Sequence, residues 1–108
     1  LSDILKKHPQ EEFAISVVTI QELYEGQSTR YKEKEKDLLS TLAPLKILGY
    51  SREVAQTAGQ LCRDTPRTFD FPDAVIAATC LINDCRLATL DKKDFSEIKG
   101  LRVLNNLN

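Results

Sequence analysis

The amino-acid sequence predicts a single α/β domain of three layers, with a mainly parallel central sheet between two layers of helices. Short β-branched apolar runs alternate with longer segments whose apolar residues recur at helical spacing, and this alternation is typical of βαβ units. A chain of 108 residues is long enough for one modest hydrophobic core. We therefore expect residues 1–108 to form one domain.

The N-terminal part predicts a helix end, a strand and a short helix. Ser2–Lys7 has the pattern of a helix that ends before a proline, and the apolar run Phe13–Val18 is typical of a buried strand. Thr19-Ile20-Gln21-Glu22 matches a capping box, which predicts that a helix begins there and stops near Gly26.

The middle of the chain predicts two amphipathic helices around a short strand. Thr29–Leu42 is rich in Lys and Glu, with leucines along one side, and Leu45–Leu48 is a strand candidate. Ser51 is the expected N-cap of a helix Ser51–Arg63. Its expected buried stripe consists of Val54, Ala55, Ala58, Leu61 and Cys62.

The C-terminal part predicts a buried helix between two strands and a loop. Thr65–Pro72 is polar and contains two prolines, whereas Asp73–Asn83 is apolar nearly all round and should be buried on most faces. Arg86–Leu90 and Leu101–Leu104 are the expected strands, with a helical turn over Asp94–Ile98 between them.

Composition limits the partners and the compartment. The net charge of −1 provides no general attraction for nucleic acid, so a nucleic-acid substrate would need a local site. No apolar stretch is long enough to span a bilayer. The odd cysteine count and the absence of a C-x-x-C pair argue against a disulfide scaffold and a zinc site. We expect Cys62 and Cys80 to be core residues and the protein to be cytoplasmic.

Four acidic residues stand where an apolar run meets a polar one: Glu22, Asp73, Asp91 and Asp94. In a parallel sheet, ligands bind beyond the carboxyl ends of the strands, and the spacing allows all four acids to face that edge. Clustered carboxylates repel one another unless a cation lies between them, and Mg²⁺ prefers oxygen ligands. Two such ions would activate water for phosphodiester cleavage.

Each acid also has a purely structural interpretation. Glu22 could only close its capping box, and Asp73 could only favour the dipole of its helix. Asp91 and Asp94 could be turn and N-cap residues. Their shared position favours a site, but position alone does not identify a nuclease.

Three motifs carry a resemblance to the PIN-domain ribonucleases, and among them to the VapC-type toxins of bacterial toxin–antitoxin pairs. Ile15–Gly26 resembles I-S-x-x-T-x-x-E-L-x-x-G, and Pro72–Thr79 resembles D-A-x-I-A-A-T. Ala88–Phe95, followed by Gly100–Val103, resembles T-x-[ND]-x-x-D-F … G-L-x-V. The motifs agree in order and spacing, and the resemblance covers essentially the whole chain.

The resemblance implies a PIN-like α/β/α fold and Mg²⁺- or Mn²⁺-dependent endonucleolytic cleavage of RNA. It implies an antitoxin protein as partner, and dimerisation. Position by position, Glu22, Asp73 and Asp91 match the catalytic, metal-binding acids, and Asp94 matches a further metal-site acid. Thr89 matches a supporting hydroxyl, and Ser16 is a further candidate for that role. Arg86, Lys92 and Lys93 are candidates for contacts with RNA phosphates.

The family's opening strand, with its acid in a D-T-[NS] motif, has no counterpart here. The chain begins at Leu1 and contains no methionine, so we expect it to lack the N-terminal central strand. We therefore expect it to be inactive or poorly folded without that segment.

Two alternatives stay open beside the enzyme. The chain could be a non-catalytic antitoxin-binding module, or a decayed toxin fragment, that uses the helices Thr29–Leu42 and Ser51–Arg63. A phosphate-accepting receiver domain would need an early acid pair and a late lysine, and the motif order does not fit that class.

Overall fold

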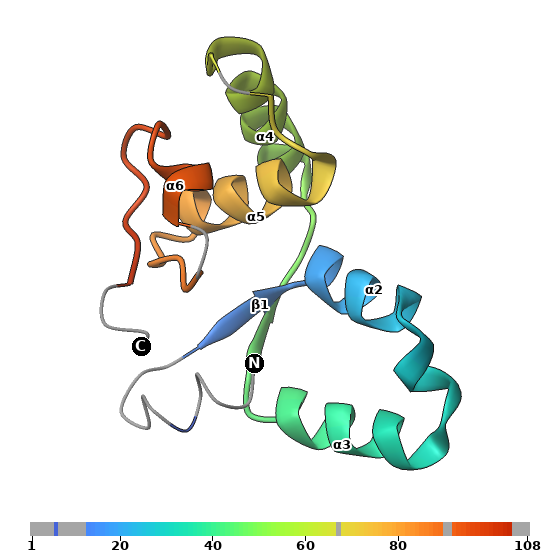
Figure 1. The fold of residues 1–108 in the computed structure, drawn as a ribbon. Coiled ribbons are helices and arrows are strands. Elements are labelled where there is room, and N and C mark those ends of the chain that lie inside the picture. Colours follow the sequence, from blue (N-terminus) through green and yellow to red (C-terminus); the bar gives the residue numbers. More distant parts are fainter. Residues whose placement is uncertain (1–5, 7–12, 67, 90–91, 105–108) are drawn as a thin grey trace. The chain divides into compact units, whose positions relative to one another are not determined.

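Strand β1 (Ala14–Ser16) pairs in parallel with strand β2 (Lys46–Leu48) in the first of two units into which the chain divides. The first unit comprises residues 1–48 and the second comprises residues 49–108. The computed structural model describes residues 6, 13–66, 68–89 and 92–104 (Figure 1). Apart from helical Lys6, the helix expected over Ser2–Lys7 lies outside these residues.

In the first unit, the connection between the two parallel strands is helical throughout most of its length. Helix α2 (Val17–Glu25), the 3₁₀ helix η1 (Gln27–Arg30) and helix α3 (Lys32–Leu42) follow β1, and the chain then returns to β2. Ile15 of β1 is buried opposite Ile47 in the ladder. This crossover confirms the predicted α/β class with parallel pairing.

Helix α2 begins earlier than the sequence suggested. The capping box from Thr19 to Glu22 was wrong, because Ser16 is the N-cap and its hydroxyl accepts a hydrogen bond from the amide of Val18 at 3.1 Å. The β-branched pair Val17-Val18 has strand propensity, but a serine cap at the end of β1 outweighs that weak preference.

The charged segment contains two helical elements where one was expected. Tyr31 has extended backbone dihedral angles and separates η1 from α3. The hydroxyl of Tyr24 in α2 donates a hydrogen bond to the Glu35 carboxylate in α3 at 2.9 Å. This bond links the two helices and raises the pKa of Tyr24, because the carboxylate stabilises the protonated phenol.

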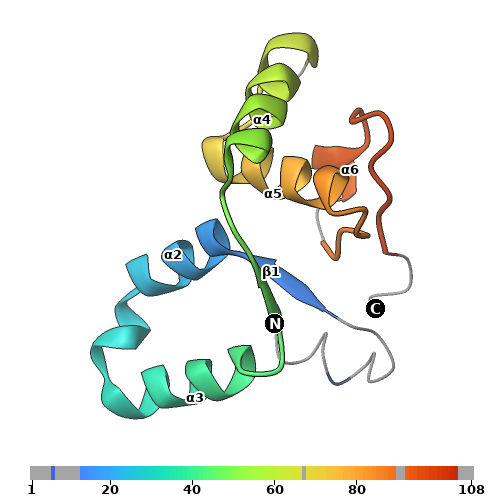
Figure 2. The ribbon, with the colours of Figure 1, turned by 180° about the vertical axis from the view of Figure 1, so that it is seen from behind.

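In the second unit, helix α4 (Arg52–Asp64) packs against helix α5 (Phe71–Ile82) (Figure 2). Ser51 caps α4 as predicted, with its hydroxyl accepting from the amide of Val54 at 3.2 Å. Most of the residues that α5 buries have small side chains. Its buried residues are Ala74, Val75, Ala77, Ala78 and Thr79. Among the described helices, none combines the length and apolar character needed to cross a bilayer.

The two helical cysteines differ in burial. Cys80 of α5 is largely buried, and burial raises the pKa of its thiol to about 11, with a further contribution from Cys85. Cys62 of α4 is exposed, so its expected place in the core was wrong. The buried stripe of α4 covers Val54 and Ala58 in the first half of the helix and does not extend to its last turn.

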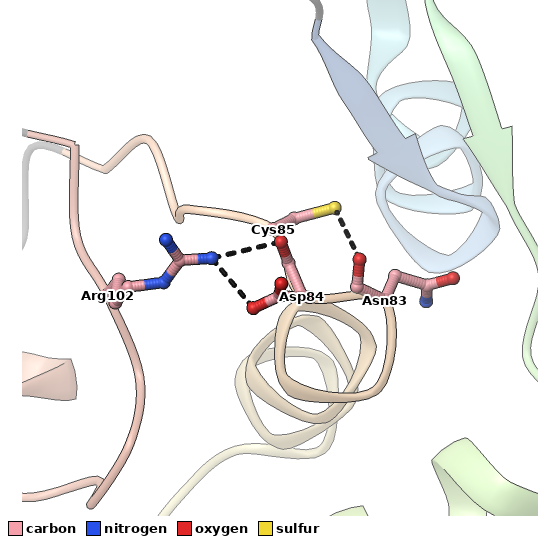
Figure 3. Close-up of polar contacts among 4 residues, drawn as sticks. All are labelled: Asn83, Asp84, Cys85 and Arg102. Atoms are coloured by element: carbon pink, nitrogen blue, oxygen red, sulfur yellow. Dashed lines mark hydrogen bonds and ion pairs between the residues drawn. The ribbon is translucent and has the colours of Figure 1, made fainter.

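Helix α5 ends in a Schellman turn. The amide of Cys85 donates to the carbonyl of Cys80 at 2.9 Å, and the amide of Asp84 donates to the carbonyl of Leu81 at 3.4 Å. This pattern places Asp84 in the left-handed region, with φ of 53°. One nitrogen of Arg102 donates to both the Asp84 carbonyl at 3.0 Å and its carboxylate at 2.8 Å (Figure 3). The guanidinium thus ties the C-terminal segment to the end of α5.

The expected strands Arg86–Leu90 and Leu101–Leu104 reduce to one parallel bridge between Leu87 and Val103. The amide of Leu87 donates to the carbonyl of Arg102, and the amide of Leu104 donates to the carbonyl of Leu87, each at 2.7 Å. A strand requires consecutive pairs, and residues 86–89 and 101–104 give only this one. The single domain over residues 1–108 stays a prediction.

Candidate metal centre

Asp73 is held by the most deeply buried helix of the described chain. It is the third residue of α5, which begins at Phe71, two residues earlier than predicted. Pro72 suits the first turn, because its missing amide hydrogen would have no partner within the helix there. The half-buried Asp73 carboxyl therefore lies at the positive end of the helix dipole, on a backbone fixed by core packing.

Asp94 is brought beside α5 by an aromatic contact. It lies in helix α6 (Lys92–Phe95) and is half-buried. The rings of Phe69 and Phe95 are both buried and stack with 6.5 Å between their centroids and an interplanar angle of 27°. Both ribbon views show α6 alongside α5 (Figure 1; Figure 2). The second unit thus holds the segments that carry Asp73 and Asp94 together.

The other two acids are not joined to this pair in the described structure. Glu22 is exposed, is the sixth residue of α2, and belongs to the first unit. Asp91 lies outside the described residues. Within the described ranges, no group of three or more His, Cys, Asp or Glu residues is arranged to hold a metal ion. The convergence of Glu22, Asp73, Asp91 and Asp94 therefore stays a prediction.

The supporting hydroxyl residues have different local settings. Ser16 is buried and its hydroxyl caps α2, which gives it a structural task. Thr89 is half-buried and comes two residues after the bridged Leu87. Their support of the site stays a prediction.

Three features of the second unit were missed in the sequence. Thr79, the last residue of the D-A-x-I-A-A-T motif, is buried and donates from its hydroxyl to the carbonyl of Val75 at 2.7 Å. The Phe69–Phe95 stack and the Arg102–Asp84 ion pair were also missed, since both join residues far apart in sequence. Only Thr79 had a sequence signal, as a polar residue within an apolar helix.

The donor chemistry of the candidate residues fits a hard divalent cation. All four acids offer carboxylate oxygens, which suit Mg²⁺ or Mn²⁺ and suit softer metals less well. Asp73 and Asp94 belong to the same unit, and the Phe69–Phe95 contact joins the segments on which they lie.

Three solved structures illustrate what this chain is similar to. A chain of a toxin–antitoxin complex from Klebsiella pneumoniae is 28% identical with a TM-score of 0.67, over 82% of this chain and 70% of that chain. VapBC-1 from nontypeable Haemophilus influenzae gives 18% identity and a TM-score of 0.77, over 96% and 84% of the two chains. VapBC2 from Rickettsia felis, bound to a promoter DNA fragment, gives 21% identity and a TM-score of 0.75. The match covers 94% of this chain and 79% of that chain.

The two sequence comparisons gave different results. A search of curated proteins finds no significant match. The family model of the PIN domain matches residues 1–101, a stretch that includes the first two motifs, most of the third and all four acids. The predicted PIN-like fold is confirmed, and the chain belongs to the PIN-domain family.

Proposed function

We propose that the protein is a divalent-metal-dependent endoribonuclease that acts as the VapC-type toxin of a toxin–antitoxin pair. The family match over residues 1–101 carries this proposal, because PIN domains are generally nucleases and the matched stretch contains Glu22, Asp73, Asp91 and Asp94. The 28% identity to a chain of a toxin–antitoxin complex supports the toxin assignment.

In the proposed mechanism, Glu22, Asp73 and Asp91 are the catalytic ligands of Mg²⁺ or Mn²⁺, and Asp94 is a further ligand. A cation held by these residues would activate a water molecule and stabilise the leaving oxygen of the RNA phosphodiester. Asp73 contributes a carboxylate of fixed position, since α5 is anchored in the core. Thr89 and Ser16 support the acidic residues. Lys93 and Arg86, both exposed, contact RNA phosphates at the edge of the site.

The proposed partners follow from the same assignment. An antitoxin protein covers the acidic site and inhibits it, and the toxin forms a homodimer. The free cysteines of the chain suit the cytoplasm, where toxin and RNA would meet.

The test is RNA cleavage with a matched pair of acid variants. Asp73→Asn removes a proposed ligand charge, and Asp37→Asn makes the same chemical change on the exposed face of α3. We expect cleavage of a fluorophore–quencher single-stranded RNA by the full-length protein to require Mg²⁺ or Mn²⁺ and to stop with EDTA. Asp73→Asn should slow it about 100-fold or more, whereas Asp37→Asn should leave it unchanged.

A second measurement separates metal binding from catalysis. Mn²⁺ should raise the thermal midpoint of the native protein and of Asp37→Asn, but not that of Asp73→Asn. Cleavage that persists in EDTA or in Asp73→Asn would contradict the proposal. Metal binding without cleavage of any RNA would favour the non-catalytic antitoxin-binding alternative.

A further inference from the structure

Two aromatic side chains are exposed near the N-terminal end of α5, the end that carries Asp73. Phe71, the first residue of α5, is 62% exposed, and Tyr50 is 45% exposed. Their ring centroids are 5.9 Å apart with an interplanar angle of 74°, an edge-to-face arrangement. A pair of large rings left in contact with water, and with each other, forgoes the burial that normally stabilises a fold.

The backbone holds these rings in a defined place. Tyr50 directly precedes Ser51, the capped start of α4, and Phe71 opens α5. Because α4 and α5 pack against each other, the two rings keep their positions without being part of the core. Phe71 is two residues before Asp73, so the ring and the carboxyl belong to the same first turn.

We propose that Tyr50 and Phe71 form a stacking platform for an unpaired nucleobase of the RNA substrate, next to the phosphate that is cleaved. This inference rests on the proposed function and adds a binding subsite to it. An edge-to-face pair leaves ring faces open, and a nucleobase stacks on such a face in a way that tolerates any base.

Base stacking would also provide RNA affinity in a protein that has little positive charge. The protein has a net charge of −1, and Asp70 and Asp73 flank the platform, so phosphate attraction alone is weak there. A nucleobase is uncharged, and its stacking on Phe71 does not oppose the nearby carboxylates. Because bases in a duplex are already stacked within it, the platform selects single-stranded RNA over duplex RNA.

The test measures RNA binding in EDTA, so neither metal binding nor cleavage contributes. The probe is a 12-nucleotide single-stranded RNA of mixed sequence that carries 2-aminopurine, whose fluorescence falls on stacking. Phe71→Leu and Tyr50→Leu keep an apolar side chain but lose the ring, and each should weaken binding about tenfold and reduce quenching. Phe71→Trp should retain both. Far-UV circular dichroism should show unchanged thermal midpoints, since both rings are exposed.

The matched control is Tyr31→Leu, which removes an equally exposed ring (63%) from the first unit and should leave binding unchanged. The same RNA annealed to its complement should bind weakly, and equally, to every variant. Wild-type affinity in Phe71→Leu, equal affinity for single strand and duplex, or no binding by the native protein would overturn the platform. So would a loss of antitoxin binding in Phe71→Leu with RNA binding intact, which would make this a protein-docking surface. Failure of cleavage alone would count against the nuclease and leave this binding result standing.

Discussion

Helices α2 and α5 each carry a proposed metal ligand, yet they are stabilised in different ways. None of the nine residues of α2, all of which the structure describes, is buried, and the helix begins at the side-chain cap of Ser16. Helix α5 buries five residues, and its N-cap residue Asp70 makes no side-chain capping bond. Local hydrogen bonding thus defines the start of α2, whereas core packing positions α5. The place of Glu22 therefore depends on nearby residues, and that of Asp73 on the whole second unit.

The largest expected effect on stability comes from the same substitution, Val→Ala, made in each of the two helices. Val75→Ala in α5 removes methyl groups from a side chain that is 1% exposed and should lower the free energy of unfolding by about 2 kcal/mol. Val17→Ala in α2 affects a side chain that is 37% exposed and should cost less than about 0.5 kcal/mol. Urea unfolding of both variants measures the difference. Equal losses would show that α2 is supported by packing as much as α5.

A smaller effect is expected at the two helix starts. Ser16→Ala removes the capping hydroxyl of α2 and should cost about 1 kcal/mol, and Ser16→Thr should restore most of it. Asp70→Ala, at the equivalent position of α5, should cost only a few tenths of a kcal/mol. Thermal unfolding followed by circular dichroism gives both values. A larger loss in Asp70→Ala than in Ser16→Ala would reverse the comparison.

The smallest effect is expected at the ends of the two helices. A glycine stands where the backbone is not left-handed, and an aspartate stands where it is. Gly26 follows α2 with an ordinary φ of −71°, whereas Asp84 follows α5 with a left-handed φ of 53°. Gly26→Ala and Asp84→Gly should therefore each raise the free energy of unfolding by about 0.5 kcal/mol. The first restricts the unfolded chain, and the second relieves the backbone.

The Asp84→Gly variant also loses the ion pair with Arg102. The side chains of Arg102 and Asp84 are 57% and 93% exposed, so the loss of this ion pair should cost little stability. Chemical denaturation resolves changes of this size when the variants are measured in parallel. If Asp84→Gly is clearly destabilised, the Arg102 contact outweighs the backbone strain.

Periodicity and capping residues predicted much of the fold from the sequence. The parallel strands around Ile15 and Ile47, the Ser51 cap and the buried face of Asp73–Asn83 were all recognisable, because each depends on residues close together in the chain. One error occurred where two local preferences competed. At Val17-Val18 the β-branched side chains favoured a strand, and the cap of Ser16 favoured a helix.

The candidate site was less accessible to the sequence, because its geometry depends on long-range contacts. Spacing placed Asp73 at the start of a helix, but it could not show that Phe69 and Phe95 stack and hold Asp94 nearby. Likewise, no local pattern indicated that Arg102 would bind the turn after α5. The grouping with Glu22 came from its position after a predicted strand and from the motif resemblance, and it stays a prediction.

The Phe69–Phe95 stack has a consequence for motion on slow timescales. A helix of four residues such as α6 has no stability of its own in water, so it persists only while its aromatic anchor remains in place. Opening of that contact would release Asp94 while α5 stays folded. Amide hydrogen exchange at Lys93–Phe95 should then be faster than in α5 and should slow when a cation bridges Asp94 to Asp73. In the proposed metal site, cation binding would therefore be coupled to the lifetime of this small helix.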